Sequence, residues 1–263
     1  MATQTGLLKI EGTLGNLTYY KTDKGYFIRK KSTLKRTRVK KDPAFRKSRE
    51  NCKEFGRASK AGCLLRTALQ PLLKNTWDGH VTGRLTREML KVIQSDTRDK
   101  HGQRNAANGD PLLLQGFEFN SEAPLATVLL TPLPAKINPE TGQAAISLPQ
   151  LVPSSDMVIP QGATHFKFVA SGAELDFKNT SHSTFFAESR QFSAELKMLN
   201  PLTLSGKLTP QSNLPQFLAF GIEFYSNLNG ISEPLNNGEF NPLSLVAVNP
   251  SASSCTSGII PPP

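Results

Sequence analysis

Cysteine is scarce in this chain of 263 residues, which carries only Cys52, Cys63 and Cys255 and has no C-x-x-C spacing. This pattern argues against a disulfide framework and a structural zinc site, and a reducing compartment is the simpler expectation. Long apolar runs are missing too. None approaches the roughly 18 residues of a membrane-spanning helix, and no early apolar run precedes a cleavage site. We therefore expect no membrane span, and either a cytoplasmic protein or a component of a particle assembled in the cytoplasm.

Catalytic signatures are equally scarce. The four histidines are scattered over the chain, at His80, His101, His165 and His182. The sequence contains no H-E-x-x-H, no G-x-S-x-G and no Walker-type phosphate loop. Glu174 and Asp176 share one face of a predicted strand, but surface strands often carry such acids. We predict that the protein is not an enzyme and that it needs no cofactor and no metal.

Positive charge is abundant but unevenly distributed. Residues 21–66 hold 17 Lys and Arg against four acids, whereas residues 117–263 hold six against 11. The formal net charge of +10 is therefore a property of the N-terminal part. Such asymmetry predicts that the two halves meet different partners, or that one half meets the other half of a neighbouring subunit.

An aromatic β-hairpin is predicted over residues 14–31. Its arms are "LTYYKT" and "YFIRK", and "TDKG" joins them in a turn that places Gly25 in the left-handed region. A lone two-stranded hairpin is only marginally stable in water. The hairpin aromatics Tyr19, Tyr20, Tyr26 and Phe27 therefore need a surface to bury against, in this chain or in another.

Two helices are predicted next. In "DPAF", Asp42 is a cap and Pro43 suits the first helical position. Spacings of three and four predict one packed face, formed by Phe45, Cys52, Phe55, Ser59, Gly62, Leu65, Leu69 and Leu72. Glycine inside a helix costs about 1 kcal/mol, so Gly56 and Gly62 predict close packing on another element. A shorter helix is expected from Arg84 to Gln94.

The C-terminal part has the sequence pattern of an antiparallel β protein. The polar residues 95–111 predict a linker, and beyond them short aromatic strands alternate with turn signals. We predict strands at 112–119, 126–131, 144–148, 165–171, 185–196, 217–226 and 243–248, with 227–241 as a long loop. The predicted fold is α+β: a basic hairpin-plus-helix module (1–94), the linker, an immunoglobulin-like β-sandwich (112–250) and a tail (251–263).

The basic segment has two interpretations. Lys and Arg can neutralise phosphates without reading sequence, and neighbouring tyrosines can stack on single-stranded bases. Alternatively, "TLKRTRV" forms a strand anchored by Leu34 and Val39, whose charges face water or an acidic protein. The residues assigned to an anionic partner are Arg29, Lys30, Lys31, Lys35, Arg36, Arg38, Lys40, Lys41, Arg46 and Arg49.

The N-terminal pattern "GTLGNLTYYKTDKGYFIRKK", followed by "DPAFRKSRENCKEFGRASKAG", resembles a family of uncharacterised bacterial proteins with a domain of unknown function. The similarity is clearest over residues 10–75. It implies a glycine-marked hairpin, a basic helix and a C-terminal immunoglobulin-like sandwich, and it implies no activity. In this chain the basic connector is heavier and the C-terminal part is longer.

Together these features favour a non-enzymatic structural protein that self-associates or scaffolds. The predicted assembly contacts are Tyr19, Tyr20, Tyr26, Phe27, Phe45, Phe55 and Gly62. The expected partner is a second copy of the chain, in an oligomer or filament, or another assembly protein. The alternative is a capsid-like or chromatin-like protein that binds nucleic acid through residues 29–49.

Overall fold

The computed structural model describes residues 2–32, 34–228 and 231–250. The chain divides into two compact units, Met1–Arg49 (unit 1) and Glu50–Pro263 (unit 2). The units therefore do not divide at residue 94, where the sequence pattern placed a boundary, because residues 50–94 pack on the C-terminal sheet. The predicted tail and Cys255 lie outside the described residues.

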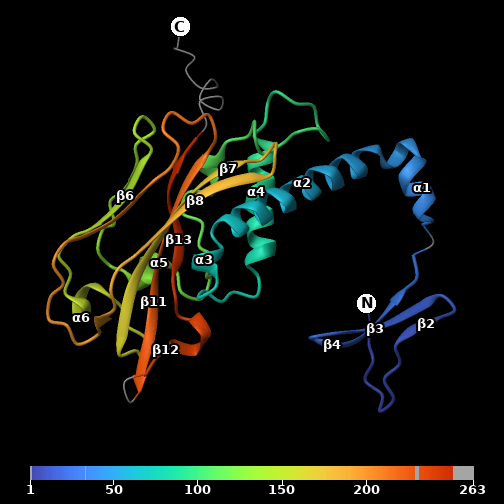
Figure 1. Cartoon of the computed structure of the whole chain (residues 1–263). Coiled ribbons are helices and arrows are strands. Elements are labelled where there is room, and N and C mark those ends of the chain that lie inside the picture. Colours follow the sequence, from blue (N-terminus) through green and yellow to red (C-terminus); the bar gives the residue numbers. More distant parts are fainter. Residues whose placement is uncertain (1, 33, 229–230, 251–263) are drawn as a thin grey trace, which may run out of the picture. The chain divides into compact units, whose positions relative to one another are not determined.

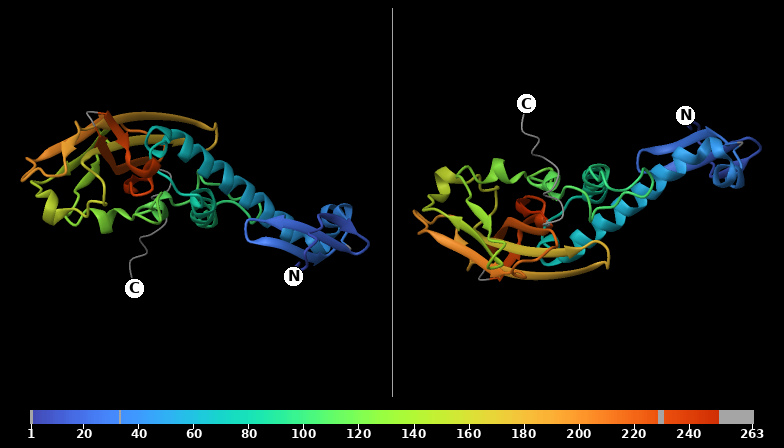
Figure 2. Two further views of the ribbon diagram at one scale, coloured as in Figure 1. Left: turned by 90° about the horizontal axis from the view of Figure 1, so that it is seen from below. Right: turned by 90° about the horizontal axis from the view of Figure 1, so that it is seen from above.

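Unit 1 is built on a small antiparallel sheet, which appears in blue in both views of Figure 2. Its strands are β1 (Ala2–Thr3), β2 (Gly12–Leu14), β3 (Leu17–Thr22) and β4 (Gly25–Lys30), in the order β1-β4-β3-β2. The strands β3 and β4 form the predicted hairpin, and Gly25 has a positive φ of 121° at its turn. Two short outer strands, which the sequence pattern did not predict, widen the hairpin into a sheet.

The basic connector of unit 1 is helical, and the strand interpretation of "TLKRTRV" is wrong. The helix α1 (Arg36–Lys41) is followed by a 3-10 turn, η1 (Pro43–Phe45), and by the start of α2 (Arg46–Ala68). Asp42 accepts a hydrogen bond from the Ala44 amide at 3.0 Å, so it caps η1 rather than the long helix. At the end of α1, Arg38 forms an i,i+4 ion pair with Asp42, with Nε 3.1 Å from Oδ2.

The helices of unit 2 are the rest of α2, α3 (Gln70–Leu73) and α4 (Val81–Gln94). The packed face of α2 differs from the predicted one, since Phe55 is 55% exposed and Cys52 is exposed. The buried residues of α2 are Glu54, Ala58, Ala61, Gly62, Leu64, Leu65 and Ala68. Gly62 packs against Leu85 of α4, where an added Cβ would lie 3.5 Å from Leu85 Cγ. Small residues such as Gly62 allow α2 and α4 to approach closely. The face of α2 that carries these small residues is therefore the one that packs against α4.

Two antiparallel sheets form the β part of unit 2. The larger contains β7 (His165–Asp176), β8 (Ser181–Glu188), β9 (Phe192–Ser193), β11 (Gln216–Leu228), β12 (Ile231–Pro234) and β13 (Leu243–Asn249). Its path is β12-β11-β7-β8, with β13 beside β11 and β9 beside β7. The smaller has the order β10-β6-β5, with β5 (Ala135–Ile137), β6 (Gln143–Leu148) and β10 (Leu202–Lys207).

Three layers result, because the large sheet buries both of its faces. Phe166 and Phe168 of β7 face the small sheet, whereas Val169 and Ala173 face the helices. Figure 1 shows α2 to α4 on one side of β7, β11 and β13, and β6 on the other. The mixed α+β class is thereby confirmed. The immunoglobulin-like topology stays a prediction.

Two predicted strands are not strands. Residues 112–119 contain the 3-10 turn η2 (Pro111–Leu114) and one isolated bridge, between Glu118 and Ser244. Residues 126–131 lie partly in the helix α5 (Leu125–Val128). Each short helix follows or contains a proline, which favours a helical first turn. A short helix also occurs at α6 (Pro153–Asp156). The strand β12 and the turn η3 (Leu235–Gly238), in which Asn236 and Asn237 have positive φ, lie inside the predicted loop.

Residues 95–111 form an ordered loop rather than a linker between domains. The carboxylate of Asp96 accepts hydrogen bonds from the amides of Arg98 and Asn105. Gly109 lies against α4, where an added Cβ would come 2.0 Å from the Val92 carbonyl oxygen. Among the described residues, none of the helices has the length and apolar character needed to cross a membrane.

Candidate assembly interface

One face of the unit 1 sheet is largely apolar and only partly covered by the described residues of that unit, where the Lys9 ammonium lies 5.9 Å from the Tyr26 ring centre. The strand register places Leu14, Leu17, Tyr19, Tyr26 and Ile28 on this face, which we call the apolar face. Leu14 is 69% and Leu17 is 41% exposed, and none of the described residues of unit 1 is buried. Exposed apolar surface gathered on one face is typical of a site that another molecule covers. The apolar face is therefore a candidate surface for a partner.

The opposite face of the sheet carries its own aromatic pair. Tyr20 and Phe27 stack with ring centroids 6.1 Å apart, and the Arg29 guanidinium lies 5.4 Å from the Tyr20 ring centre. Because side chains alternate along a strand, the four predicted hairpin contacts are split between the faces. Tyr19 and Tyr26 lie on the apolar face, and Tyr20 and Phe27 lie on the other.

The remaining predicted contacts are distributed over both units. Phe45 is half-buried in η1 of unit 1. Phe55 and Gly62 belong to unit 2, where Phe55 is exposed and Gly62 is buried against α4. Gly62 thus serves packing inside unit 2.

Several of the predicted anion-binding residues have partners within unit 1. Arg49 Nη1 donates to the carbonyl oxygens of Val39 and Asp42, each at 2.8 Å, at the C-terminal end of α1. Arg38 Nε donates to the Asp42 carboxylate at 3.1 Å. The Asp42 pKa is lowered, first by the Ala44 amide and then by Arg38. These two arginines stabilise the turn between α1 and α2.

The other basic side chains are presented to solvent. Exposed residues of the set are Arg29, Lys30, Lys31, Lys35, Arg36, Lys40, Lys41 and Arg46. A recess of about 600 Å³ beside α1 is lined by Lys35, Thr37, Arg38, Lys41 and Asp42. Its dominant positive charge makes it suitable for an anionic group.

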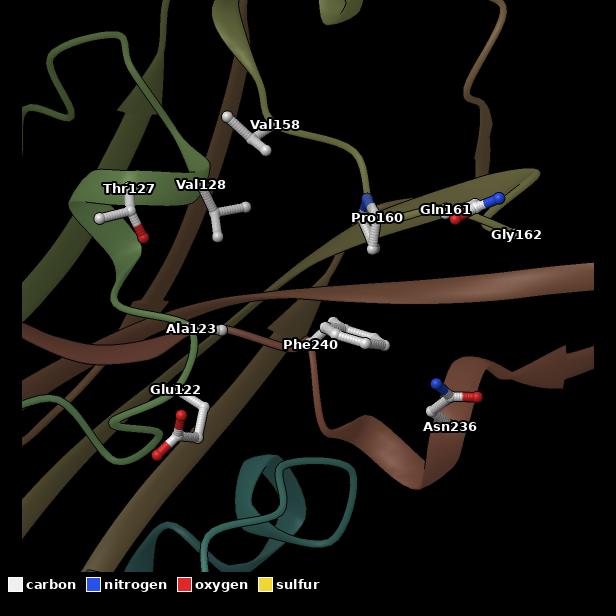
Figure 3. A pocket seen from close by; sticks show the side chains of 10 residues that line it. All are labelled: Glu122, Ala123, Thr127, Val128, Val158, Pro160, Gln161, Gly162, Asn236 and Phe240. Carbon is white, nitrogen blue, oxygen red and sulfur yellow. The ribbon is translucent and has the colours of Figure 1, made fainter.

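Unit 2 contains an apolar recess of about 620 Å³ that the sequence pattern did not predict. Its lining residues are Glu122, Ala123, Thr127, Val128, Val158, Pro160, Gln161, Gly162, Asn236 and Phe240. Figure 3 shows Val128, Val158 and Pro160 on one side of this space, with the Phe240 ring across from them. We call it the Phe240 recess. Its residues come from three distant segments, so no local motif marks it.

One cluster of charged side chains in unit 2 is mutually paired. Lys167 Nζ lies 2.9 Å from Glu188 Oε2 and 3.2 Å from Glu223 Oε2, and Asn75 donates to Glu223 Oε1 at 3.0 Å. Burial opposes the charge on Lys167, but Glu188 and Glu223 outweigh it and raise the pKa of Lys167. Burial, together with Glu223, raises the pKa of Tyr225 to about 12. This cluster ties the segment after α3 to the sheet and has the character of structural packing.

Comparison of the chain with protein-family models, with curated proteins and with solved structures finds no match. This result is consistent with the uncharacterised family that the N-terminal pattern resembles. It transfers no activity to the chain.

Proposed function

We propose that the protein is a non-enzymatic assembly protein, which joins a second copy of itself through the apolar face of unit 1. The observation that carries this proposal is that unit 1 has a four-stranded sheet without a buried residue among those described. Full burial of an apolar side chain such as Leu14 or Leu17 contributes about 1.5 to 3 kcal/mol. Covering this face is therefore a sizeable driving force for association.

Charge supports a second copy as the partner. The strand register places Lys21 and Lys30 on the same side of the sheet as the apolar face, at its ends. Residues 117–263 carry 11 acids against six Lys and Arg. Opposite charges on two surfaces favour and orient their encounter. In this proposal the two sheets of unit 2 act as an immunoglobulin-like scaffold. The assembly of several copies forms in the cytoplasm.

The test compares charges placed on the two faces of the same strands. In one variant Leu14→Asp and Leu17→Asp alter the apolar face; in the control Thr13→Asp and Thr18→Asp alter the opposite face. Light scattering after size exclusion gives the mass of each full-length protein at several concentrations. We expect an oligomer for the wild type and the control, and a monomer for the apolar-face variant. A wild type that is monomeric at every concentration would refute the proposal.

Nucleic-acid binding is the second candidate, and the recess beside α1 favours it. Lys35, Arg38 and Lys41 line that recess, and exposed cations bind phosphates by releasing counterions. The test is binding of the full chain to a single-stranded oligonucleotide at low and moderate salt. A phosphate-binding surface loses orders of magnitude in affinity over this range. Lys40→Glu with Lys41→Glu would weaken this binding, whereas Leu14→Asp with Leu17→Asp would leave it.

A further inference from the structure

We propose that the loop carrying Leu7 and Leu8 in one copy inserts into the Phe240 recess of a second copy, which makes the assembly head-to-tail. This inference rests on the proposed function and adds a second contact, between the loop of unit 1 and unit 2 of the neighbour, to the contact that the apolar face makes. It assigns a role to an exposed leucine pair and to an apolar recess, neither of which has a partner among the described residues of its own unit.

The loop presents its leucines to solvent. Leu7 is 105% and Leu8 is 86% exposed, the two highest values among the exposed large hydrophobic residues described. Single exposed apolar residues are ordinary, whereas contiguous exposed apolar surface marks interaction sites. Leu7 and Leu8 are adjacent, so their side chains can bind a partner together.

The loop is also held in shape. The side chain of Gln4 closes it, since Gln4 Nε2 donates to the Ile10 carbonyl oxygen at 3.1 Å and Gln4 Oε1 accepts from the Ile10 amide at 2.9 Å. The Gln4 amide is fixed in turn on the Tyr26 carbonyl oxygen of β4 at 3.0 Å. A loop that is ordered before binding loses less conformational entropy when it docks.

The Phe240 recess suits such an anchor. Val158 is 54% and Phe240 is 36% exposed at its wall, so apolar surface is left in contact with water. Its volume of about 620 Å³ lies within the range of roughly 300 to 1,000 Å³ of sites for drug-sized molecules. Two leucine side chains do not exceed such a space.

Charge identifies the occupant as this chain's own N-terminal loop. The recess carries the carboxylate of Glu122 in its lining, and Glu239 is exposed next to Phe240. The loop continues from Leu8 into Lys9, whose ammonium also contacts the Gln4 carbonyl oxygen and the Tyr26 ring, and the loop belongs to the basic unit. An apolar pair followed by a cation thus matches an apolar recess with acids. The loop and the recess are different surfaces, so in a pair of copies one loop and one recess stay unoccupied. Each can bind a further copy, and the contact therefore propagates into rings or filaments.

A mixing experiment tests the contact. The loop variant carries Leu7→Asp and Leu8→Asp, and the recess variant carries Val158→Asp. The main-chain hydrogen bond from the Val158 amide to the Val128 carbonyl oxygen, 2.8 Å long, does not depend on that side chain. The matched control carries Leu112→Asp and Leu113→Asp, which alter the exposed leucine pair of η2. Thermal melts verify that every full-length variant is folded.

We expect each of the two variants to be monomeric where the wild type and the control are oligomeric. An equimolar mixture should form a complex of two chains, because the loop variant keeps an intact recess and the recess variant an intact loop. If both variants are monomeric and their mixture stays monomeric, the loop and the recess do not meet and the inference is refuted. If both keep the wild-type oligomer while Leu14→Asp with Leu17→Asp dissociates it, the inference fails and the proposed function stands.

Discussion

Arg104 holds both carboxylate oxygens of Glu54, with Nε 2.8 Å from Oε1 and Nη2 2.8 Å from Oε2. The Glu54 side chain is 2% exposed and also accepts the Gly102 amide at 2.7 Å. This bidentate pair fastens the loop 95–111 to α2. The pKa of Glu54 is lowered, chiefly by the hydrogen bond from Arg104.

Glu54→Gln should destabilise the protein markedly, because it leaves the Arg104 guanidinium without its counter-charge in a largely buried place. We expect a loss of about 2 to 4 kcal/mol in the free energy of unfolding, measured by urea denaturation. Glu88→Gln is the control, since Glu88 pairs with the exposed Lys91 on the surface of α4. That change should cost less than about 1 kcal/mol. Equal losses in the two variants would contradict this prediction.

Asp78 should make stability fall in acid. Its burial opposes ionisation, but hydrogen bonds from the His80 amide, Arg84 and Ser121 outweigh burial and lower the pKa of Asp78 from 3.8 to about 2. Because the folded state holds the charged form, this contribution is present above pH 3.8 and is lost as the pH falls through about 2.

Urea titrations of the wild type and Asp78→Asn at several pH values measure this contribution. The difference in unfolding free energy between the two proteins should be large at pH 7 and should shrink towards pH 2. Glu140→Gln removes an exposed carboxylate of unit 2 and serves as the control. A difference that stays constant from pH 7 to pH 2 would show that the Asp78 charge contributes nothing.

Two glycines of unit 2 should respond to alanine in opposite ways. Gly56 lies inside α2 with nothing within 4 Å of an added Cβ, so Gly56→Ala should stabilise by about 0.5 to 1 kcal/mol. At Gly109 the added Cβ would come 2.0 Å from the Val92 carbonyl oxygen, and Gly109→Ala should destabilise by at least about 2 kcal/mol. Thermal melts of the two variants decide both signs.

Arg49 should stabilise α1 rather than bind an external anion. Arg49→Ala removes the donor to the Val39 and Asp42 carbonyl oxygens, and we expect α1 to open more easily by about 1 to 2 kcal/mol. Faster amide hydrogen exchange over residues 38–42 would report this opening. Lys47→Ala, an exposed neighbour on α2, should leave the exchange unchanged. If the two variants behave alike, Arg49 has no such role.

Local chemistry made parts of the fold predictable. The turn "TDKG" needs a residue that tolerates positive φ, and Gly25 supplies it. The second helix was predicted from Arg84 to Gln94 and runs from Val81 to Gln94, with Leu85, Met89, Val92 and Ile93 buried. Both signals depend on neighbours a few residues away.

Other elements depended on distant partners. Among the strands described, β10 pairs with β6, and the paired residues, from Leu202 with Leu148 to Lys207 with Gln143, lie roughly 60 positions apart in the chain. Its Gly206 leaves room for the ring of Phe185, which belongs to the other sheet. The packed face of α2 was predicted only in part. Apolar residues at spacings of three and four are compatible with several faces, and contact with α4 decides which face is buried.

The sequence by itself determined the basic N-terminal part, the aromatic hairpin, the short helix α4 and the long strands β7 and β11, since composition and periodicity are local properties. Only the tertiary structure decided that residues 50–94 belong with the sheets, that Arg49 is engaged with carbonyl oxygens, and that three distant segments enclose the Phe240 recess. The physical reason is that burial and pairing are properties of contacts between distant residues, which no short stretch of sequence contains.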